Sequence, residues 1–283
     1  MRFLCYSSLV ISERLVFKPD HQIEAHPSDF GLDFEELRLQ TSDGLRLHAW
    51  LFPGKRDVAF IWFHGNSGNI TQRLDTVQLL HDHLGVSILL FDYRGYGRSE
   101  GRPSEPGVYR DGEAAVAWVR QHPRLGKQPL VLFGRSLGSA IAVEMALRFH
   151  RPPAGEGKGE GLAGVVLEAA FLSIQEVAKK ALPGRIFTPL FTTRFNNAAK
   201  IKIVRAPVLI IHGDRDGDVP FSHGLRLFKR ASEPKWLYTV AGAGHDDIMQ
   251  IAGEEYFATL DRFLERIERK SSTSQTTWLE VTR

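Results

Sequence analysis

The sequence LVLFGRSLGSAIAVEMAL, residues Leu130–Leu147, decides the fold. Its first part, Leu130–Phe133, is a short apolar run typical of a buried parallel strand. Its last part, Ala140–Leu147, is typical of a helix that packs an apolar face. Between them, Gly134–Gly138 reads G-x-S-x-G, the nucleophile-elbow pattern of a strand that turns sharply into a helix. The pattern predicts that Ser136 projects above a sheet as an exposed nucleophile.

The two glycines of this motif have a steric reason. A turn this sharp strains the serine backbone and brings the flanking residues together, so Gly134 and Gly138 leave room that side chains would fill. The Ser136 hydroxyl then lies at the amino end of a helix, where free N–H groups favour the negative charge of an acyl-transfer intermediate. The alternative is a glycine-rich turn with an incidental serine, because G-x-S-x-G alone also arises by chance.

Length and composition are those of an ordinary globular enzyme. The 283 residues fit one α/β domain, with 43% hydrophobic and 24% charged residues. The net charge is +3, and basic residues are scattered among acidic ones, so no nucleic-acid partner is expected. The one cysteine, Cys5, excludes an internal disulfide and a cysteine-based metal site. It fits a reducing compartment, and we expect a cytoplasmic protein.

The ends of the chain differ from its centre. Residues 1–33 are expected to form an extended N-terminal segment without a clear period. Its first part, Met1–Ile11, is apolar but too short to span a bilayer, which leaves peripheral membrane association through the N-terminus as a possibility. The range 34–268 is predicted to be the folded domain, and the polar range 269–283 is predicted to be a disordered tail.

Alternating strands and helices organise the domain. The ranges 34–40 and 45–52 alternate in polarity around the turn residues Thr41–Gly44, which predicts an antiparallel hairpin. Strand–turn–helix units then begin at Val58, Val86 and Leu130. We therefore predict a mainly parallel central sheet with helices on both faces, and ligands at the carboxyl ends of its strands.

The second half continues this rhythm with one interruption. Strands are predicted at 162–168, 208–211 and 236–240, and one long amphipathic helix is predicted to run to Glu268. No strand-like run occurs in the range 171–203, which we expect to be a small lid insertion over Ser136. Its apolar side chains are candidates for substrate binding, or alternatively pin the insertion to the sheet: Phe187, Leu190, Phe191 and also Phe195.

A serine hydroxyl needs a base, and the base needs a carboxylate that orients it. The elbow architecture fixes the chain order as serine, acid, histidine, which leaves His223 and His245 as candidate bases. His223 falls within a predicted helix, whereas His245 lies in a glycine turn after the last strand. His245 is therefore the predicted base.

The acid remains open among several carboxylates, of which Asp216 is favoured. Three aspartates share one loop after the strand at 208–211, and Glu168 ends the preceding strand. Most carboxylates in such loops form turns and caps. Asp214 and Asp218 are expected to serve in that way.

Two backbone N–H groups are predicted to form an oxyanion hole. The elbow supplies the N–H of Leu137, and the loop after Val58–Phe63 is expected to supply that of Asn66. His64 could be a second base, but a histidine that enters a turn more often binds backbone. No metal is expected at His81-Asp82-His83, because adjacent and i+2 side chains on a helix diverge.

Five motifs occur in a characteristic order: HGNSGN, FDYRGYGRSEG, GRSLGSA, HGDRDGDVP and GAGHDD. Together they resemble the α/β-hydrolase superfamily over about residues 34–268, in particular the branch of the α/β-hydrolase-domain protein depalmitoylases and their bacterial relatives. The resemblance implies Ser136 as nucleophile, His245 as base and Asp216, in the family's HGxxDxxVP stretch, as acid. The cysteine-rich N-terminus of the depalmitoylases is absent here.

The expected function is that of a serine hydrolase without cofactor or metal. It would cleave a small-molecule carboxylic ester or thioester through an acyl-enzyme with the triad Ser136, Asp216 and His245. A serine at the elbow argues against dehalogenase and epoxide hydrolase chemistry, which needs aspartate there. The alternatives are a peptidase of the aminopeptidase type and a non-catalytic binding protein on the same fold.

Overall fold

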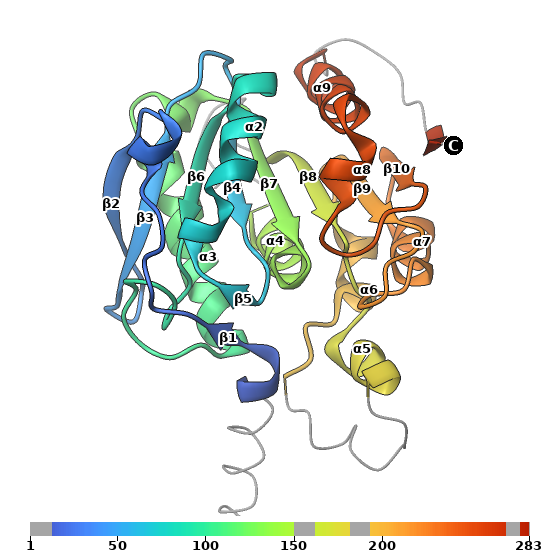
Figure 1. Ribbon diagram of the computed structural model, residues 1–283, viewed down its shortest axis with the longest axis horizontal. Coiled ribbons are helices and arrows are strands. Elements are labelled where there is room, and N and C mark those ends of the chain that lie inside the picture. The colour runs from blue at the N-terminus through green and yellow to red at the C-terminus, as the bar shows by residue number, and fades with distance from the viewer. Residues whose placement is uncertain (1–12, 150–161, 182–192, 270–277, 283) are drawn as a thin grey trace, which may run out of the picture.

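A twisted sheet passes through the centre of the protein, as the computed structural model shows (Figure 1). The structure describes residues 13–149, 162–181, 193–269 and 278–282. Within these residues, the sheet has nine strands in the order β11-β10-β9-β8-β7-β4-β6-β3-β2. In chain order the strands are β2 (Glu35–Gln40), β3 (Arg46–Phe52), β4 (Ala59–Phe63), β6 (Ser87–Phe91), β7 (Leu130–Arg135), β8 (Leu162–Glu168), β9 (Val208–Gly213), β10 (Lys235–Val240) and β11 (Trp278–Thr282).

The direction of the strands matches the predicted mainly parallel sheet. β2 and β3 form the predicted antiparallel hairpin, and β3 also pairs antiparallel with β6. Every other neighbouring pair from β6 to β11 is parallel. The carboxyl ends of β4, β7, β9 and β10 therefore meet at one edge, where the loops that follow them come together.

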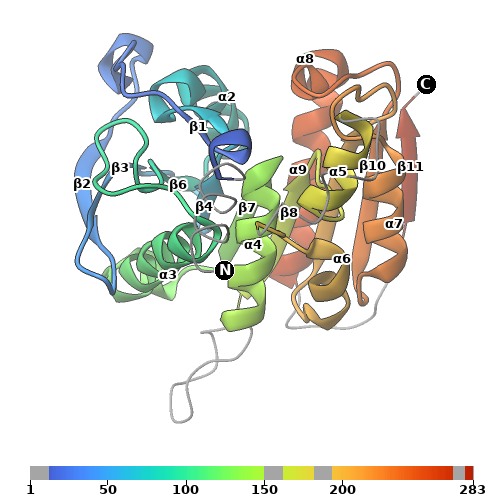
Figure 2. The same cartoon turned by 90° about the horizontal axis from the view of Figure 1, so that it is seen from below.

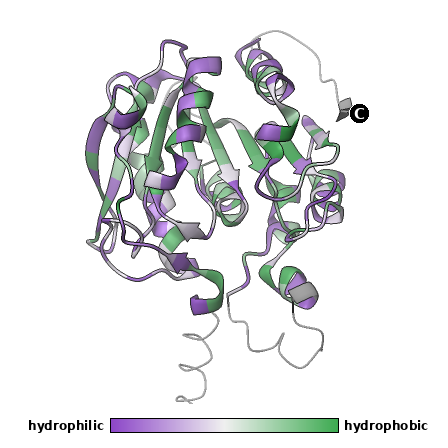
Figure 3. Ribbon diagram, viewed as in Figure 1, coloured by the Kyte–Doolittle hydropathy of each residue, from purple (hydrophilic) through white to green (hydrophobic). Residues whose placement is uncertain are grey.

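Helices cover both faces of the sheet, as predicted (Figure 2). The core on one face contains side chains from α3 (Glu105–Gln121), α4 (Leu137–Arg148) and α7 (Ser222–Arg230). The core on the other face contains side chains from α2 (Leu74–Leu84), α8 (Ile248–Ala252) and α9 (Glu254–Glu268). The strands between these layers are the most hydrophobic part of the ribbon (Figure 3). Each fully buried large apolar side chain contributes about 1.5–3 kcal/mol to folding.

The range 171–203 contains helices where the sequence shows no strand. Its described residues include α5 (Ile174–Ala181), the short α6 (Asn197–Lys200) and a 3-10 turn at Ile201–Ile203. Phe171 and Leu172 are buried in the core at its beginning. None of the helices in the described part of the chain is long and apolar enough to cross a membrane.

The long C-terminal helix that the sequence predicted is divided. α8 ends before Gly253 and α9 begins after it, because Gly253 has a φ of +55°, which is outside the helical region. The prediction of a disordered tail is wrong for Trp278–Thr282, which form β11 in parallel register with β10. Aromatic and β-branched residues favour a strand, and β10 without β11 would be an open sheet edge.

The N-terminal segment also pairs with the domain. Lys18–Pro19 form a two-residue strand, β1, that pairs in parallel with β5 (Ser67–Gly68). Val16 and Phe17 immediately before it are buried. The segment therefore lies directly beside the loop that follows β4.

Candidate active site

Ser136 lies at a sharp turn between β7 and α4. Its φ of +51° and ψ of −116° place a non-glycine residue in a region that L-amino acids rarely adopt. A side chain at Gly134 would put its Cβ 2.5 Å from the carbonyl oxygen of Gly138, and one at Gly138 would come within 1.9 Å of the carbonyl oxygen of Phe63. Both glycines are therefore required by the close approach of backbone to backbone.

A chain of hydrogen bonds connects the serine, the histidine and the aspartate that the sequence singled out. The Ser136 hydroxyl lies 3.1 Å from His245 Nε2, and His245 Nδ1 lies 2.8 Å from Asp216 Oδ2. Because an ionised carboxylate only accepts, Nδ1 carries the proton and Nε2 is free to accept from Ser136. These residues come from the loops after β7, β9 and β10, which explains how positions 109 and 29 residues apart meet.

The Asp216 carboxylate is fixed in its loop by further donors. Oδ1 accepts the backbone N–H groups of Asp218 at 2.9 Å and Val219 at 2.7 Å. Oδ2 lies 3.4 Å from Nε2 of the buried His212, which sequence reasoning did not single out. Burial alone would raise the pKa of Asp216, but the hydrogen bonds from His212 and His245 outweigh it and hold the pKa well below the usual range. Asp216 is thus ionised.

His245 has a perturbed pKa with identifiable causes. Desolvation by burial lowers the pKa of His245, whereas the hydrogen bond and the negative charge of Asp216 raise it, and the net result is a pKa above the ordinary 6.5. The positive charge of Arg135 acts in the opposite direction to Asp216. An imidazole oriented in this way can take a proton from a serine hydroxyl as the hydroxyl attacks.

The other candidate acids have different partners. Asp214 accepts the backbone N–H of Gly242 at 2.7 Å and so holds a turn, and Asp218 is exposed. Glu168 forms a buried ion pair with Arg135, at 3.0 Å from Arg135 Nε, and accepts the hydroxyl of Tyr256. None of these carboxylates forms an ion pair with His245.

Arg135 is a residue of the site that the sequence analysis missed. Besides Glu168, its guanidinium contacts the carbonyl oxygen of His245 at 3.1 Å and the carboxylate of Asp246 at 2.8 Å. It thereby connects β7 and β8 to the loop that carries His245. Its position as a variable residue in G-x-S-x-G gave no signal for this role.

The two residues predicted to supply oxyanion donors, Asn66 and Leu137, line the same cavity as Ser136. Leu137 is the first residue of α4, so its N–H has no acceptor within the helix. Asn66 lines the same cavity as Ser136, and its side-chain amide donates to the carbonyl oxygen of Val16 at 3.0 Å. Neither backbone N–H donates to another group among the described residues. Both are therefore available to a ligand.

His64, next to this loop, is fully buried and donates from Nδ1 to the carbonyl oxygen of Gly65 at 2.8 Å. Its ring stacks on Tyr93, with the ring centroids 4.1 Å apart. Burial, and then the nearby charge of Arg73, lower the pKa of His64 to about 4. A neutral histidine bound to backbone supports the loop, as the sequence analysis expected of it.

A cavity of about 740 Å³ opens onto Ser136 and His245. We refer to it as the Ser136 cavity. Part of its wall is apolar and comes from the N-terminal segment, the start of the insertion and one face of α5: Leu15, Val16, Phe171, Ile174, Val177 and Ala178. The space is large enough for a small substrate with an apolar group.

The predicted lid residues are only partly placed. Phe187, Leu190 and Phe191 lie outside the described residues. Phe195 is fully buried in the core and packs edge-on against Phe17 and Tyr109, outside the lining of the Ser136 cavity. Substrate binding by Phe195 is therefore wrong, and the alternative, that it pins the insertion, fits its burial. Among the described residues, no group of histidine, cysteine, aspartate and glutamate side chains could hold a metal ion.

Comparisons with known proteins identify the family and the fold. The family model described as "alpha/beta hydrolase fold" matches residues 58–185. An uncharacterized protein of Mycobacterium tuberculosis is 37% identical over 232 residues, which cover 81% of this chain and 78% of that protein. The alpha/beta hydrolase domain-containing protein WAV2 of Arabidopsis thaliana is 29% identical over 94% of this chain and 92% of its own length.

Among solved structures, an esterase of Pyrococcus furiosus superposes with a TM-score of 0.72. It is 20% identical in sequence, and the match covers 89% of this chain and 98% of the esterase. A serine hydrolase homologue from Coxiella burnetii also matches, with a TM-score of 0.59 and 23% identity over 81% of this chain and 97% of that structure. These likenesses show the fold.

Proposed function

The chain belongs to the α/β-hydrolase superfamily, and from this premise we propose that it is a serine hydrolase that cleaves carboxylic esters or thioesters. The fold and its esterase neighbours support a hydrolase. The observation that carries the finer proposal is the hydrogen-bonded chain from Ser136 through His245 to Asp216. No cofactor enters the reaction.

The reaction would proceed in two halves. Ser136 Oγ attacks the acyl carbon while its proton passes to His245 Nε2, and a tetrahedral oxyanion forms. The N–H groups of Leu137 and Asn66 stabilise this oxyanion, and Asp216 stabilises the imidazolium. The bond to the leaving group then breaks, His245 donates the proton to the departing oxygen or sulfur, and an acyl-serine remains.

Water completes the cycle by the same route. His245 takes a proton from the water molecule as its oxygen attacks the acyl-serine, and a second tetrahedral intermediate forms in the same oxyanion hole. Its collapse breaks the bond to Ser136 Oγ, which recovers its proton from His245. The products of this second half are a carboxylic acid and the free enzyme.

Covalent labelling tests this proposal without knowledge of the natural substrate. A fluorophosphonate probe should label the wild-type protein in a single position, Ser136, identified by mass spectrometry of the digest. Ser136→Ala should abolish labelling, and Ser139→Ala is the matched control, because Ser139 is fully buried in α4 and should leave labelling intact. Labelling that persists in Ser136→Ala, or its absence from folded wild-type protein, would overturn the assignment.

A further inference from the structure

Arg73 is a cation in the Ser136 cavity that forms no ion pair with any carboxylate in the described part of the chain. It lines the cavity from the N-terminus of α2 and is only partly accessible. Its Nη2 donates to the carbonyl oxygen of Ser67 at 2.6 Å, whereas its Nε is buried and has no hydrogen-bond acceptor among the described residues. No described aspartate or glutamate forms an ion pair with it. A guanidinium in this state has lost water without gaining a counter-charge, which is costly.

The surroundings increase this cost. Burial and the positive charge of Arg135 both lower the pKa of Arg73, and Asp246 offsets them only in part. Arg73 is also the N-cap residue of α2, where the helix dipole is positive and disfavours a cation. The charge of Arg73 therefore does not stabilise its own helix.

The second arginine of the cavity provides a comparison. Arg135 pairs with both Glu168 and Asp246, so its charge is used within the protein. Two ranges outside the described residues, 1–12 and 182–192, lie close in sequence to residues that line the cavity. Neither range contains an aspartate or glutamate that could pair with Arg73. Among the described residues, the Arg73 charge is therefore compensated only in part, by the more distant Asp246.

The two sides of the cavity differ in chemistry. The apolar side chains Ile174 and Val177 come from α5, and Arg73 comes from the turn before α2. Ser136 lines the same cavity as the apolar side chains and the cation. A ligand that spans the serine would meet both.

We propose that Arg73 binds an anionic oxygen group of the substrate, so that the preferred substrates are esters or thioesters with an apolar acyl group and an anionic leaving group. This inference rests on the proposed function and names its substrate class. Carboxylate and phosphate share the relevant chemistry, since each presents two oxygens that match the donors of a guanidinium. The bound anion would supply the counter-charge that Arg73 lacks.

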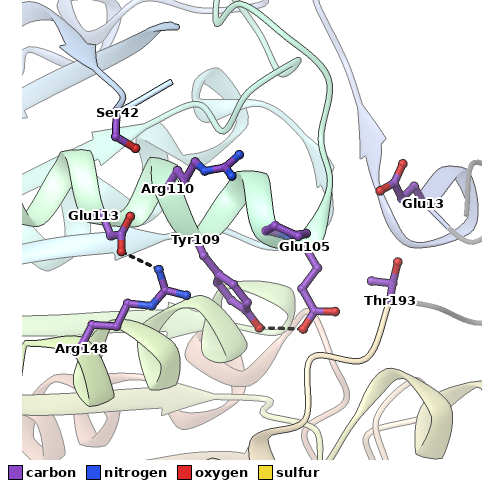
Figure 4. A pocket seen from close by; sticks show the side chains of 9 residues that line it. Glu13, Ser42, Glu105, Tyr109, Arg110, Glu113, Arg148 and Thr193 are labelled. Carbon is purple, nitrogen blue, oxygen red and sulfur yellow. Dashed lines mark hydrogen bonds and ion pairs between the residues drawn. The ribbon is translucent and has the colours of Figure 1, made fainter. Parts of the chain in front are cut away.

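In a second cavity, the arginines form ion pairs with carboxylates of the chain. It has about 540 Å³, lies along α3, and is lined by arginines and glutamates (Figure 4). Its Arg148 pairs with Glu113, and Arg110 lies 3.2 Å from Asp43. These charges are already paired within the chain. Arg110 therefore serves as a control arginine outside the Ser136 cavity.

Matched esters test the proposal. We would compare 4-(butanoyloxy)benzoate with its neutral methyl ester, and use 4-(butanoyloxy)phenyl phosphate to distinguish phosphate from carboxylate recognition. Arg73→Gln should lower kcat/KM for the anionic esters by roughly ten- to a hundredfold more than for the neutral ester, as expected for lost charge-assisted hydrogen bonds. Arg73→Lys should retain part of the preference, and Arg110→Gln should retain all of it.

A measurement on the unmodified protein keeps the test independent of how the variants fold. Wild-type preference for the anionic esters should decline as NaCl is raised to about 1 M, where the Debye length falls to about 3 Å. Equal activity on charged and neutral esters at low salt, or an equal loss on both in Arg73→Gln, would overturn the proposal.

Binding separates this inference from the proposed function. Calorimetry with Ser136→Ala protein measures the affinity for each ester without turnover. Tighter binding of the anionic esters, lost in the Ser136→Ala, Arg73→Gln double variant, supports the anion site even if wild-type protein hydrolyses neither ester. Hydrolysis of esters without any binding preference would instead support the proposed function and refute the anion site.

Discussion

Arg135 Nη2 donates to the carbonyl oxygen of His245 at 3.1 Å, so the residue immediately before the proposed nucleophile holds the loop of the proposed base. Glu168 forms an ion pair with the same guanidinium and also accepts a hydrogen bond from the hydroxyl of Tyr256. One side chain thus connects the strand that carries Ser136 to the turn that carries His245. Arg135 is a positioning residue, because it reaches the reacting atoms only through His245.

This contact predicts a pH effect. The base must be neutral to accept a proton, so kcat/KM should rise with pH through the pKa of His245, which lies above 6.5. The charge of Arg135 lowers the pKa of His245. Arg135→Gln should therefore move the acidic limb of the pH–rate profile to higher pH. The control is Arg98→Gln, since Arg98 is exposed and pairs with Glu36 away from the site. An unchanged limb, or one at lower pH, would contradict this account.

Asp216→Asn should have two separable effects. An asparagine at this position stabilises the wrong tautomer of His245, so kcat should fall by roughly 10⁴-fold. It also removes the charge that raises the pKa of His245, so the acidic limb of the residual activity should move to lower pH, opposite to Arg135→Gln. Steady-state kinetics across pH would measure both.

Asp218→Asn is the matched control for this change. Asp218 is exposed in the same loop and contributes its backbone N–H, not its carboxylate, to the hydrogen bond with Asp216. Its substitution should change kcat only slightly. A loss comparable to that of Asp216→Asn would mean that the acid is assigned to the wrong aspartate.

Ser136 should show opposite effects on activity and stability. Ser136→Ala should reduce kcat on the order of 10⁶-fold and leave the fold intact. Ser136→Gly should be equally inactive yet more stable than Ser136→Ala by about 1 kcal/mol, because glycine adopts the φ of +51° without strain. Chemical denaturation of the two variants would give this difference. Equal stabilities would indicate that the elbow stores little backbone strain.

The apolar wall of the Ser136 cavity predicts a chain-length preference. In a p-nitrophenyl ester series, kcat/KM should rise from acetate to a short or medium acyl chain, as each buried methylene contributes about 0.8 kcal/mol, and then fall. Ile174→Ala should flatten this rise more than it lowers activity on acetate. We make the same prediction for Phe191→Ala, a substitution that lies outside the described residues.

Ile203→Ala provides the comparison, because Ile203 is 52% exposed and does not line the cavity. Its chain-length profile should match that of the wild type. If activity instead declines steadily from acetate onward in the wild-type protein, the apolar wall does not receive the acyl group.

Local patterns sufficed for much of the fold. Apolar runs identified β4 and the strands from β6 to β10, since buried parallel strands have a continuous hydrophobic signature, and alternation identified the β2–β3 hairpin. Chain order and loop position pointed to Ser136, Asp216 and His245, which the structure brings into hydrogen-bonding distance. These inferences need only local sequence patterns and the order of the motifs along the chain.

Features that depend on distant contacts were not predictable in this way. Arg135 contacts Glu168 and His245, and His212 contacts Asp216. The sequence around Arg135 and His212 does not indicate these partners. β11 pairs with the edge of β10, which is a contact between distant parts of the sequence. The polar composition of the range 269–283 gave no sign of that contact, so the sequence predicted a disordered tail. The burial of Phe195 against Phe17 likewise joins two segments that look unrelated in sequence.

The pairing of β1 with β5 supports the loop that carries the proposed oxyanion donor. Asn66, the proposed oxyanion donor, is held from both sides by this segment, through the carbonyl oxygen of Val16 and the N–H of Lys18. A chain trimmed to begin at residue 21 would retain all strands of the large sheet but lose this brace. We expect such trimming to lower the melting temperature, because the buried Val16 and Phe17 are lost, and to slow acylation in the protein that remains folded, because Asn66 loses both contacts.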